Sequence, residues 1–247
     1  MRGYTFSVTL PRYCVASFEG RGRTFTETER RWEYQMTARP DFCVVSGPDH
    51  AGKSSALREL IAGGLALPIV SVDRTHLGPG HLLLERLHGA IVADVGTALG
   101  QAFSPDFLTA LSQTLVIHMR DRIQRMSGRP ILVDSYYYKT LTKCRMAGAA
   151  KNPMFDWWRS FPQPRRVIYL DVAPATAWDR ARRENSAHPL ECYGNDVGQE
   201  GFETYQRDLG KLIREEIAHL PVTVIGEQRS AGHTARAIRE VLDDEYA

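Results

Sequence analysis

The octapeptide Gly47–Ser54, which reads GPDHAGKS, constrains this chain more than any other stretch. It has the spacing G-x-x-x-x-G-K-S of a phosphate-binding loop. The short apolar run DFCVVSG leads into it, and KSSALRELIAGGLA, which has helical periodicity, follows it. Such a loop lies between a buried strand and a helix, because the helix N-terminus then points free N–H groups at the phosphates. The stretch therefore predicts a P-loop at a strand-to-helix turn.

The rest of the chain alternates short β-branched runs with long amphipathic runs. Besides 41–47, we expect strands over residues 67–73, 129–138, 165–174 and 221–226. We expect helices over residues 81–103, 106–126, 175–185, 202–220 and 233–247. This order, together with the P-loop, predicts an α/β protein with a parallel β-sheet flanked by helices on both faces, a three-layer P-loop fold, over residues 40–247. Residues 1–39 form an N-terminal extension to which the sequence assigns no chemistry.

Composition excludes several classes of partner. The net charge is only +2, so we expect no nucleic-acid polymer as a ligand. No apolar run approaches the roughly 20 residues that cross a bilayer, and the start of the chain is a poor secretory signal. The four cysteines form no C-x-x-C pair, which is typical of reduced thiols. We therefore expect a cytoplasmic protein without a membrane segment, whose partner is a small-molecule phosphoryl acceptor.

The loop residues can each be given a role toward a nucleotide. Gly47 and Gly52 let the backbone approach the phosphates without a side-chain clash. Lys53 brings a positive charge to the β- and γ-phosphates, and the Ser54 hydroxyl is a ligand for Mg²⁺. ATP and Mg²⁺ are thus the expected cofactors. The predicted nucleotide-binding residues are Gly47, Pro48, His50, Ala51, Gly52, Lys53, Ser54 and Ser55.

Two further features point to phosphoryl transfer. Asp134 follows the apolar run ILV and is positioned to hold a water on Mg²⁺ or to orient the acceptor, although a helix-capping role remains an alternative. Arg180, Arg182 and Arg183 precede a polar, turn-rich segment that we predict to be a lid near residues 184–200. Such arginines stabilise charge that moves off the γ-phosphate. The guanine-reading motif N-K-x-D of a GTPase is absent.

Residues 41–242 resemble the thymidylate kinase family. GPDHAGKS is similar to its loop G-x-[DE]-x-[SA]-G-K-[ST], RVIYLDVAPATAWDRARRE to its strand and arginine-bearing helix, and QEGFETYQRDLGKL to the helix after its lid. The resemblance implies a Mg²⁺-dependent, ATP-dependent kinase of nucleoside monophosphates that is a homodimer. It also implies that Asp49 faces the acceptor sugar and the metal, and that the three arginines are the lid-side arginines.

The acceptor side departs from that family. Asp134-Ser135-Tyr136 stands where the family has D-R-[YH], so its phosphate-gripping arginine is missing. Gln113 falls where the family has its base-reading arginine, and Arg74 is the nearest equivalent of another lost arginine. Lys139, Lys143 and Arg145 follow closely and either replace the lost charge or form part of the solvated surface. The expected acceptor-binding residues are Arg74, Gln113, Ser135, Tyr136 and Lys139.

The sequence leaves three functions open. The first is a kinase of a nucleotide or nucleoside-like acceptor other than thymidylate. The second is a kinase of an unphosphorylated alcohol or specialised metabolite. The third is a non-catalytic nucleotide-binding module, which the Lys53–Ser54 pair disfavours. In the first two readings the catalytic residues are Lys53, Asp49, Arg180, Arg182, Arg183 and Asp134, with Ser54 and Asp134 at the metal.

Overall fold

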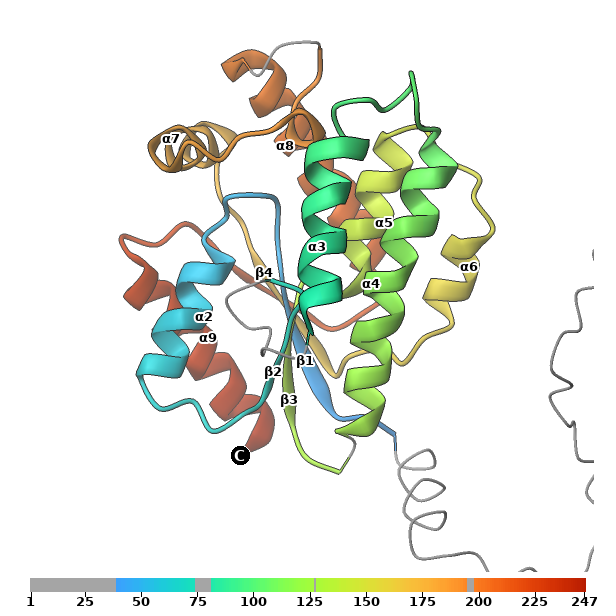
Figure 1. The fold of residues 1–247 in the computed structure, drawn as a ribbon. Helices are drawn as coiled ribbons and strands as arrows, with labels where there is room; N and C mark the ends of the chain where they lie inside the picture. The colour runs from blue at the N-terminus through green and yellow to red at the C-terminus, as the bar shows by residue number, and fades with distance from the viewer. Residues whose placement is uncertain (1–38, 74–80, 127, 195–197) are drawn as a thin grey trace, which may run out of the picture.

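The computed structural model describes residues 39–73, 81–126, 128–194 and 198–247. In these ranges five strands form one parallel sheet in the order β2-β3-β1-β4-β5 (Figure 1). The strands are β1 (Phe42–Ser46), β2 (Ile69–Val70), β3 (Ile131–Asp134), β4 (Arg166–Leu170) and β5 (Val222–Ile225). Each of the five lies within a predicted strand segment, and the predicted fold class is confirmed.

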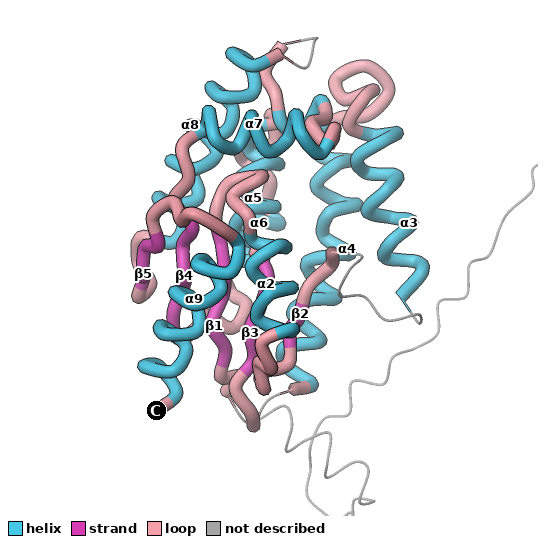
Figure 2. Tube along the Cα trace, turned by 90° about the vertical axis from the view of Figure 1, so that its left-hand side faces the viewer, coloured by secondary structure: helices cyan, strands magenta, loops and turns pink. Residues whose placement is uncertain are grey.

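The helices cover both faces of this sheet. α2 (Lys53–Ala62) and α9 (Ala231–Tyr246) pack together on one face, and Figure 2 views the sheet from their side. The other face carries the long helices α4 (Pro105–Arg125), α5 (Tyr136–Met146) and α8 (Gln199–Ile217). The remaining described helices are α3 (Leu82–Ala90), a π-helix (Ile91–Val95), α6 (Met154–Arg159), α7 (Pro174–Glu184) and a 3₁₀ turn (Pro189–Glu191).

The central strand β1 shows why the sheet is an inner layer. Phe42 and Val44 belong to the core beneath α4, α5 and α8, whereas Cys43 and Val45 belong to the core beneath α2 and α9. All four side chains are fully buried. Alternate residues of a strand point to opposite faces, so an uninterrupted apolar run is what a strand covered on both faces requires.

Several predicted boundaries differ from the structure, among them the end of β3 and the length of α3. The strand expected over 129–138 ends at Asp134, because Ser135 and Tyr136 turn the chain with φ of 63° and 38° and α5 begins at once. The helix expected over 81–103 is α-helical only to Ala90 and continues as the π-helix to Val95. α6 was not predicted, since a helix of only 6 residues carries little periodicity.

The sheet positions the candidate site. All strands run in the same direction, so their carboxyl ends share one edge, and the loop after β1 lies there beside the ends of β3 and β4. None of the helices in the described part of the chain is long and apolar enough to cross a membrane.

Candidate functional site

The loop after β1 folds as its glycines require. Gly47 has a φ of 148°, and a Cβ added there would lie 2.7 Å from the Leu170 carbonyl oxygen at the end of β4. Gly52 has a φ of 91° and begins α2 as its N-cap. His50 also takes a left-handed conformation, with a φ of 54°, which costs energy for a side chain with a Cβ. The tight loop leaves the first N–H groups of α2 directed at its centre, as in a phosphate cradle.

Lys53 lies inside this cradle. Its Nζ donates to the carbonyl oxygens of Gly47 at 3.0 Å and Pro48 at 2.5 Å, and the residue is only 7% exposed. Burial, together with the nearby charge of Lys139, lowers the pKa of Lys53 to about 7. The positive charge of the Lys53 ammonium is therefore not balanced by its surroundings. An anion placed in the loop would stabilise the charged form.

A chain of hydroxyl and carboxyl groups runs from the cradle along the strand ends. Ser54 Oγ donates to Asp73 Oδ2 at 3.0 Å, and the Asp73 backbone N–H donates to Ser71 Oγ at 2.9 Å. Ser71 Oγ donates to Asp134 Oδ2 at 2.9 Å, and Ser135 Oγ donates to Asp134 Oδ1 at the same distance. Asp73 was not predicted as a site residue, although it ends the strand expected over residues 67–73.

These groups fit a magnesium ion that is shared with a nucleotide. They are hard oxygen ligands, and Mg²⁺ in such sites is held by one or two protein oxygens together with phosphate oxygens and water. Within the described residues no group of three or more His, Cys, Asp and Glu side chains forms a metal site. A nucleotide-bound Mg²⁺ does not need one, so Ser54 and the carboxylates beyond it suffice.

Asp49 is held by two lysines of α5. Its carboxylate oxygens lie 2.7 Å from Lys139 Nζ and 2.8 Å from Lys143 Nζ, and its backbone N–H donates to Gln206 Oε1 at 3.0 Å. Burial acts to raise the pKa of Asp49, but the charges of Lys139 and Lys143 hold it well below its ordinary value. The structure therefore brings two predicted residues, Asp49 and Lys139, into one ion pair, in which each satisfies the other.

A second buried carboxylate was missed in the sequence. Glu191, in the predicted lid, is 6% exposed and accepts from His50 Nε2 at 3.0 Å. It also lies 3.2 Å from His188 Nε2 and 3.8 Å from Lys143 Nζ. Burial and Asp49 act to raise its pKa, but hydrogen bonds from the two histidines and the charge of Lys143 lower it to about 2. We call His50, Lys143, His188 and Glu191 the Glu191 cluster.

The residues on either side of Glu191 also pack against the rest of the domain. Leu190 packs so closely on Gly96, after the π-helix, that an added Cβ there would lie 2.8 Å from Leu190 Cγ. Cys192 is buried with Phe202 of α8. The described part of the predicted lid is thus anchored through polar and apolar contacts, and residues 195–197 of the predicted range lie outside the described residues.

The three predicted arginines are not equivalent. Arg180 lines the cavity and donates from Nη1 to the His50 carbonyl oxygen at 3.1 Å. Arg183 also lines the cavity. The Arg182 side chain is 69% exposed, lies 3.9 Å from Asp179, and is not part of the cavity lining. Two of the three therefore face the space above the cradle.

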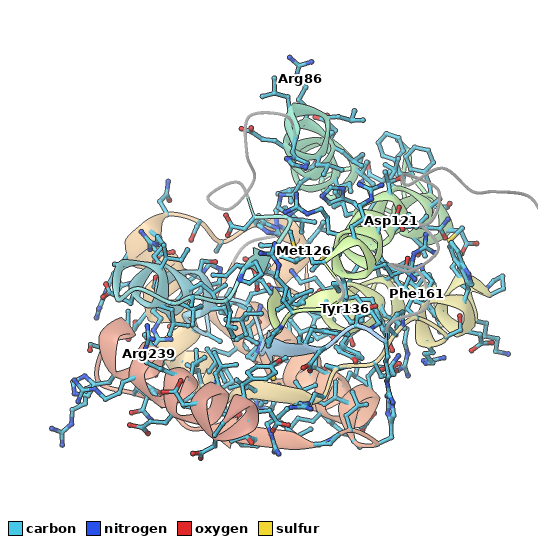
Figure 3. The ribbon with its side chains drawn as sticks, turned by 90° about the horizontal axis from the view of Figure 1, so that it is seen from below. Arg86, Asp121, Met126, Tyr136, Phe161 and Arg239 are labelled. Carbon is cyan, nitrogen blue, oxygen red and sulfur yellow. The ribbon has the colours of Figure 1, made fainter. Side chains whose placement is uncertain are left out.

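The predicted acceptor residues are also placed unevenly. Ser135 and Lys139 line the cavity. Tyr136 borders it, but its ring packs into the core 5.6 Å from that of Phe42, and Figure 3 shows it in the interior. Along α4 the structure puts Ser112 rather than Gln113 in the cavity wall. Arg74 lies outside the described residues.

One cavity of about 1140 Å³ joins these features. It contains the predicted loop residues Asp49 to Ser55 and extends to both sides of Lys53. One side reaches α7 and the loop between β5 and α9, and the other reaches α3, the π-helix and α4. Pockets for small ligands are usually about 300–1,000 Å³, so this cavity exceeds the upper end of that range and leaves room beside a first ligand for a second, small one.

Comparison with known proteins gives a likeness of fold. No family model matches the chain. No curated protein matches it either. Among the solved structures that match is the deoxyadenosine kinase from M. mycoides with bound dATP. It is 17% identical with a TM-score of 0.53, and the match covers 82% of this chain and 99% of the kinase chain. At this identity the likeness shows the P-loop kinase fold alone.

Proposed function

We propose that this protein is an ATP-dependent kinase that transfers the γ-phosphoryl group to a hydroxyl of a small-molecule acceptor. The observation that carries the proposal is the buried Lys53 in the loop after β1, opposite Arg180, with Ser54 linked to Asp73. These groups bracket a phosphate chain with positive charge and metal-binding oxygen. The solved neighbour, a deoxyadenosine kinase with bound dATP, supports this class of reaction.

In the proposed reaction each residue has a separate task. Lys53 binds the β- and γ-phosphates, and Arg180 and Arg183 stabilise charge on the phosphate that is transferred. Ser54 holds Mg²⁺, which when bound draws charge from the phosphate oxygens. The acceptor oxygen forms a bond to the γ-phosphorus while the bond to the β-phosphate oxygen breaks, and ADP leaves.

Asp73 lies beside the metal site. Its carboxylate accepts from Ser54 Oγ at 3.0 Å, and its backbone N–H donates to Ser71 Oγ at 2.9 Å. Asp49 is engaged by two lysines and Asp134 accepts from two serine hydroxyls. In the proposed reaction Asp73, through its link to Ser54, positions the acceptor hydroxyl next to the γ-phosphate, and the proton of that hydroxyl is released as the bond to phosphorus forms.

The test compares Lys53→Met with Lys211→Met in an assay of acceptor-dependent ADP formation. Lys211 is exposed on α8 and is the matched control. We expect Lys53→Met to lower turnover by at least about a hundredfold, because it removes a charge that acts on the transferred phosphate. Lys211→Met should match the wild type. Equal turnover in Lys53→Met and wild type would contradict the proposal, as would ATP binding without any acceptor-dependent turnover.

A further inference from the structure

The two sides of the cavity differ in chemistry. The side between α7 and the loop before α9 is lined by polar side chains, among them Thr176, Glu227, Gln228, Ser230 and Thr234. These offer the donors and acceptors that the edge of a nucleobase needs. The ATP base therefore belongs on this side, and the opposite side is left for the acceptor.

One wall of the acceptor side, formed by α4 and the π-helix, is aliphatic. Leu108, Ser112, Leu115, Val116 and Met119 of α4 lie at the spacing of one helix face and line the cavity. Ile91 and Val92 of the π-helix, and Leu99 after it, line it as well. Among the described residues of α3, the π-helix, the loop after it and α4, the lining includes no Asn, Gln, Asp, Glu, Lys or Arg.

Polar groups from other elements border this wall, since Lys139, Thr140, Lys143, Glu191 and Tyr205 also line the cavity. Ser112 carries a single hydroxyl, and Thr109 Oγ1 donates to the Pro105 carbonyl oxygen at 2.8 Å. His88 lines the cavity from α3, where the residue is exposed. Lys139 and Lys143, at the centre of the cavity, are both paired with Asp49. A phosphate on the acceptor would have to displace one of these ion pairs.

A nucleobase is therefore a poor occupant of this wall. Its edge carries several donors and acceptors, and each one that is buried unpaired lowers affinity by about tenfold to a hundredfold. An aliphatic chain carries no donors or acceptors that need partners. Each CH₂ that it buries raises the affinity of the acceptor by about fourfold. The aliphatic wall thus favours an apolar acceptor over one with hydrogen-bonding groups.

We propose that the acceptor is an unphosphorylated alcohol with an aliphatic body, which lies against α4 and the π-helix with its hydroxyl toward Asp73. This rests on the proposed kinase function and specifies its substrate class. The alcohol oxygen bonds to the γ-phosphorus of ATP, the bond to the β-phosphate oxygen breaks, and the hydroxyl proton is released. The products are a phosphate monoester and ADP.

The experiment measures kcat/KM of the full chain with MgATP and two series of acceptors. One series is butan-1-ol, hexan-1-ol and octan-1-ol, and the other is thymidine, deoxyadenosine and thymidylate. We expect kcat/KM to rise about fourfold per added CH₂ along the alcohols. Octan-1-ol should exceed each nucleoside and thymidylate by at least about tenfold.

Two variants locate the effect on α4. Val116→Thr keeps the shape of a buried side chain but adds a hydroxyl, so it should lower kcat/KM for octan-1-ol by about tenfold, at unchanged affinity for ATP. The control is Val224→Thr, at a position on β5 that is 58% exposed. Ser112→Ala, in the same wall, is measured with the nucleosides. A fall of tenfold or more for a nucleoside in this variant would instead show that Ser112 reads a base.

The outcomes separate this inference from the function on which it rests. A nucleoside or thymidylate that equals or exceeds octan-1-ol overturns the aliphatic acceptor and leaves the kinase function in place. Bound ATP with no transfer to any acceptor of either series overturns both. Alcohol turnover that does not rise with chain length also overturns the inference, because an apolar wall would then play no part.

Discussion

Replacing Glu191 by Gln should destabilise the protein by about 2–3 kcal/mol at pH 7. The carboxylate is buried and is held by His50, His188 and Lys143, which lower its pKa from 4.5 to about 2. One pKa unit corresponds to about 1.4 kcal/mol, so the charged form contributes about 3 kcal/mol to stability. The neutral amide keeps the shape and part of the hydrogen bonding, which reduces the loss slightly.

The same pKa gives the effect a defined pH dependence. Because the folded-state pKa is depressed, the contribution of Glu191 is complete above pH 4.5 and is lost as the pH falls from 4.5 to 2. Urea unfolding followed by tryptophan fluorescence at pH 7, 5, 4 and 3 measures this. The gap between wild type and Glu191→Gln should be equal at pH 7 and 5 and should shrink below pH 4.5.

The control for this experiment is Glu240→Gln, at an exposed position on α9, which should change stability by less than about 0.5 kcal/mol. A Glu191→Gln variant as stable as the wild type at pH 7 would refute the reasoning. So would a gap that widens below pH 4.5, since the carboxylate would then be stabilised in its protonated form.

Three further perturbations test other parts of the site. Because the pKa of Lys53 is about 7, binding of MgATP at pH 8 should be accompanied by the uptake of roughly 0.9 proton by Lys53. Calorimetry in buffers of different ionisation enthalpy measures this uptake, and Lys53→Met should abolish it. A wild-type protein that takes up no proton would contradict the role of Lys53 at the phosphates. Gly96→Ala places a Cβ 2.8 Å from Leu190 Cγ and should lower the free energy of unfolding in urea by about 1–3 kcal/mol. The control is Gly89→Ala, whose Cβ would meet nothing within 4 Å and should leave stability unchanged. Equal stability of the two variants would show that the packing of Leu190 on Gly96 does not contribute to stability. Hydrogen exchange over residues 185–194 should slow when MgATP binds, because Arg180 and Glu191 link α7 and this segment to the phosphate loop. Unchanged protection would mean that the segment does not respond to nucleotide.

The central part of the fold could be predicted because its signals are local. β1, the phosphate loop and α2 form one contiguous stretch in which apolar run, glycine spacing and helical periodicity agree. The boundary after β3 could not be predicted, because Tyr136, Tyr137 and Tyr138 suit a strand by composition. In the protein the left-handed turn at Ser135 and Tyr136 directs them into a helix.

The site was harder to predict where it depends on distant contacts. Gln113 and Ser112 differ by one position, which on a helix is a rotation of about 100°, so counting residues could not decide which faces the cavity. Glu191 meets His50 across 141 residues of sequence, and neither residue carries a local sign of that contact. Asp73 was the exception, since it ends the strand expected over residues 67–73 and was open to the argument made for Asp134.

The most direct test of the account follows the γ-phosphorus of ATP by ³¹P NMR in the presence of MgATP, the full chain and the alcohol and nucleoside acceptors named above. The account predicts that the γ-phosphate signal is replaced by an equal amount of a phosphate monoester together with ADP, and that Lys53→Met leaves it unchanged on the same time scale. Release of the phosphorus as inorganic phosphate alone, or an unchanged ATP spectrum with every acceptor, would contradict a kinase.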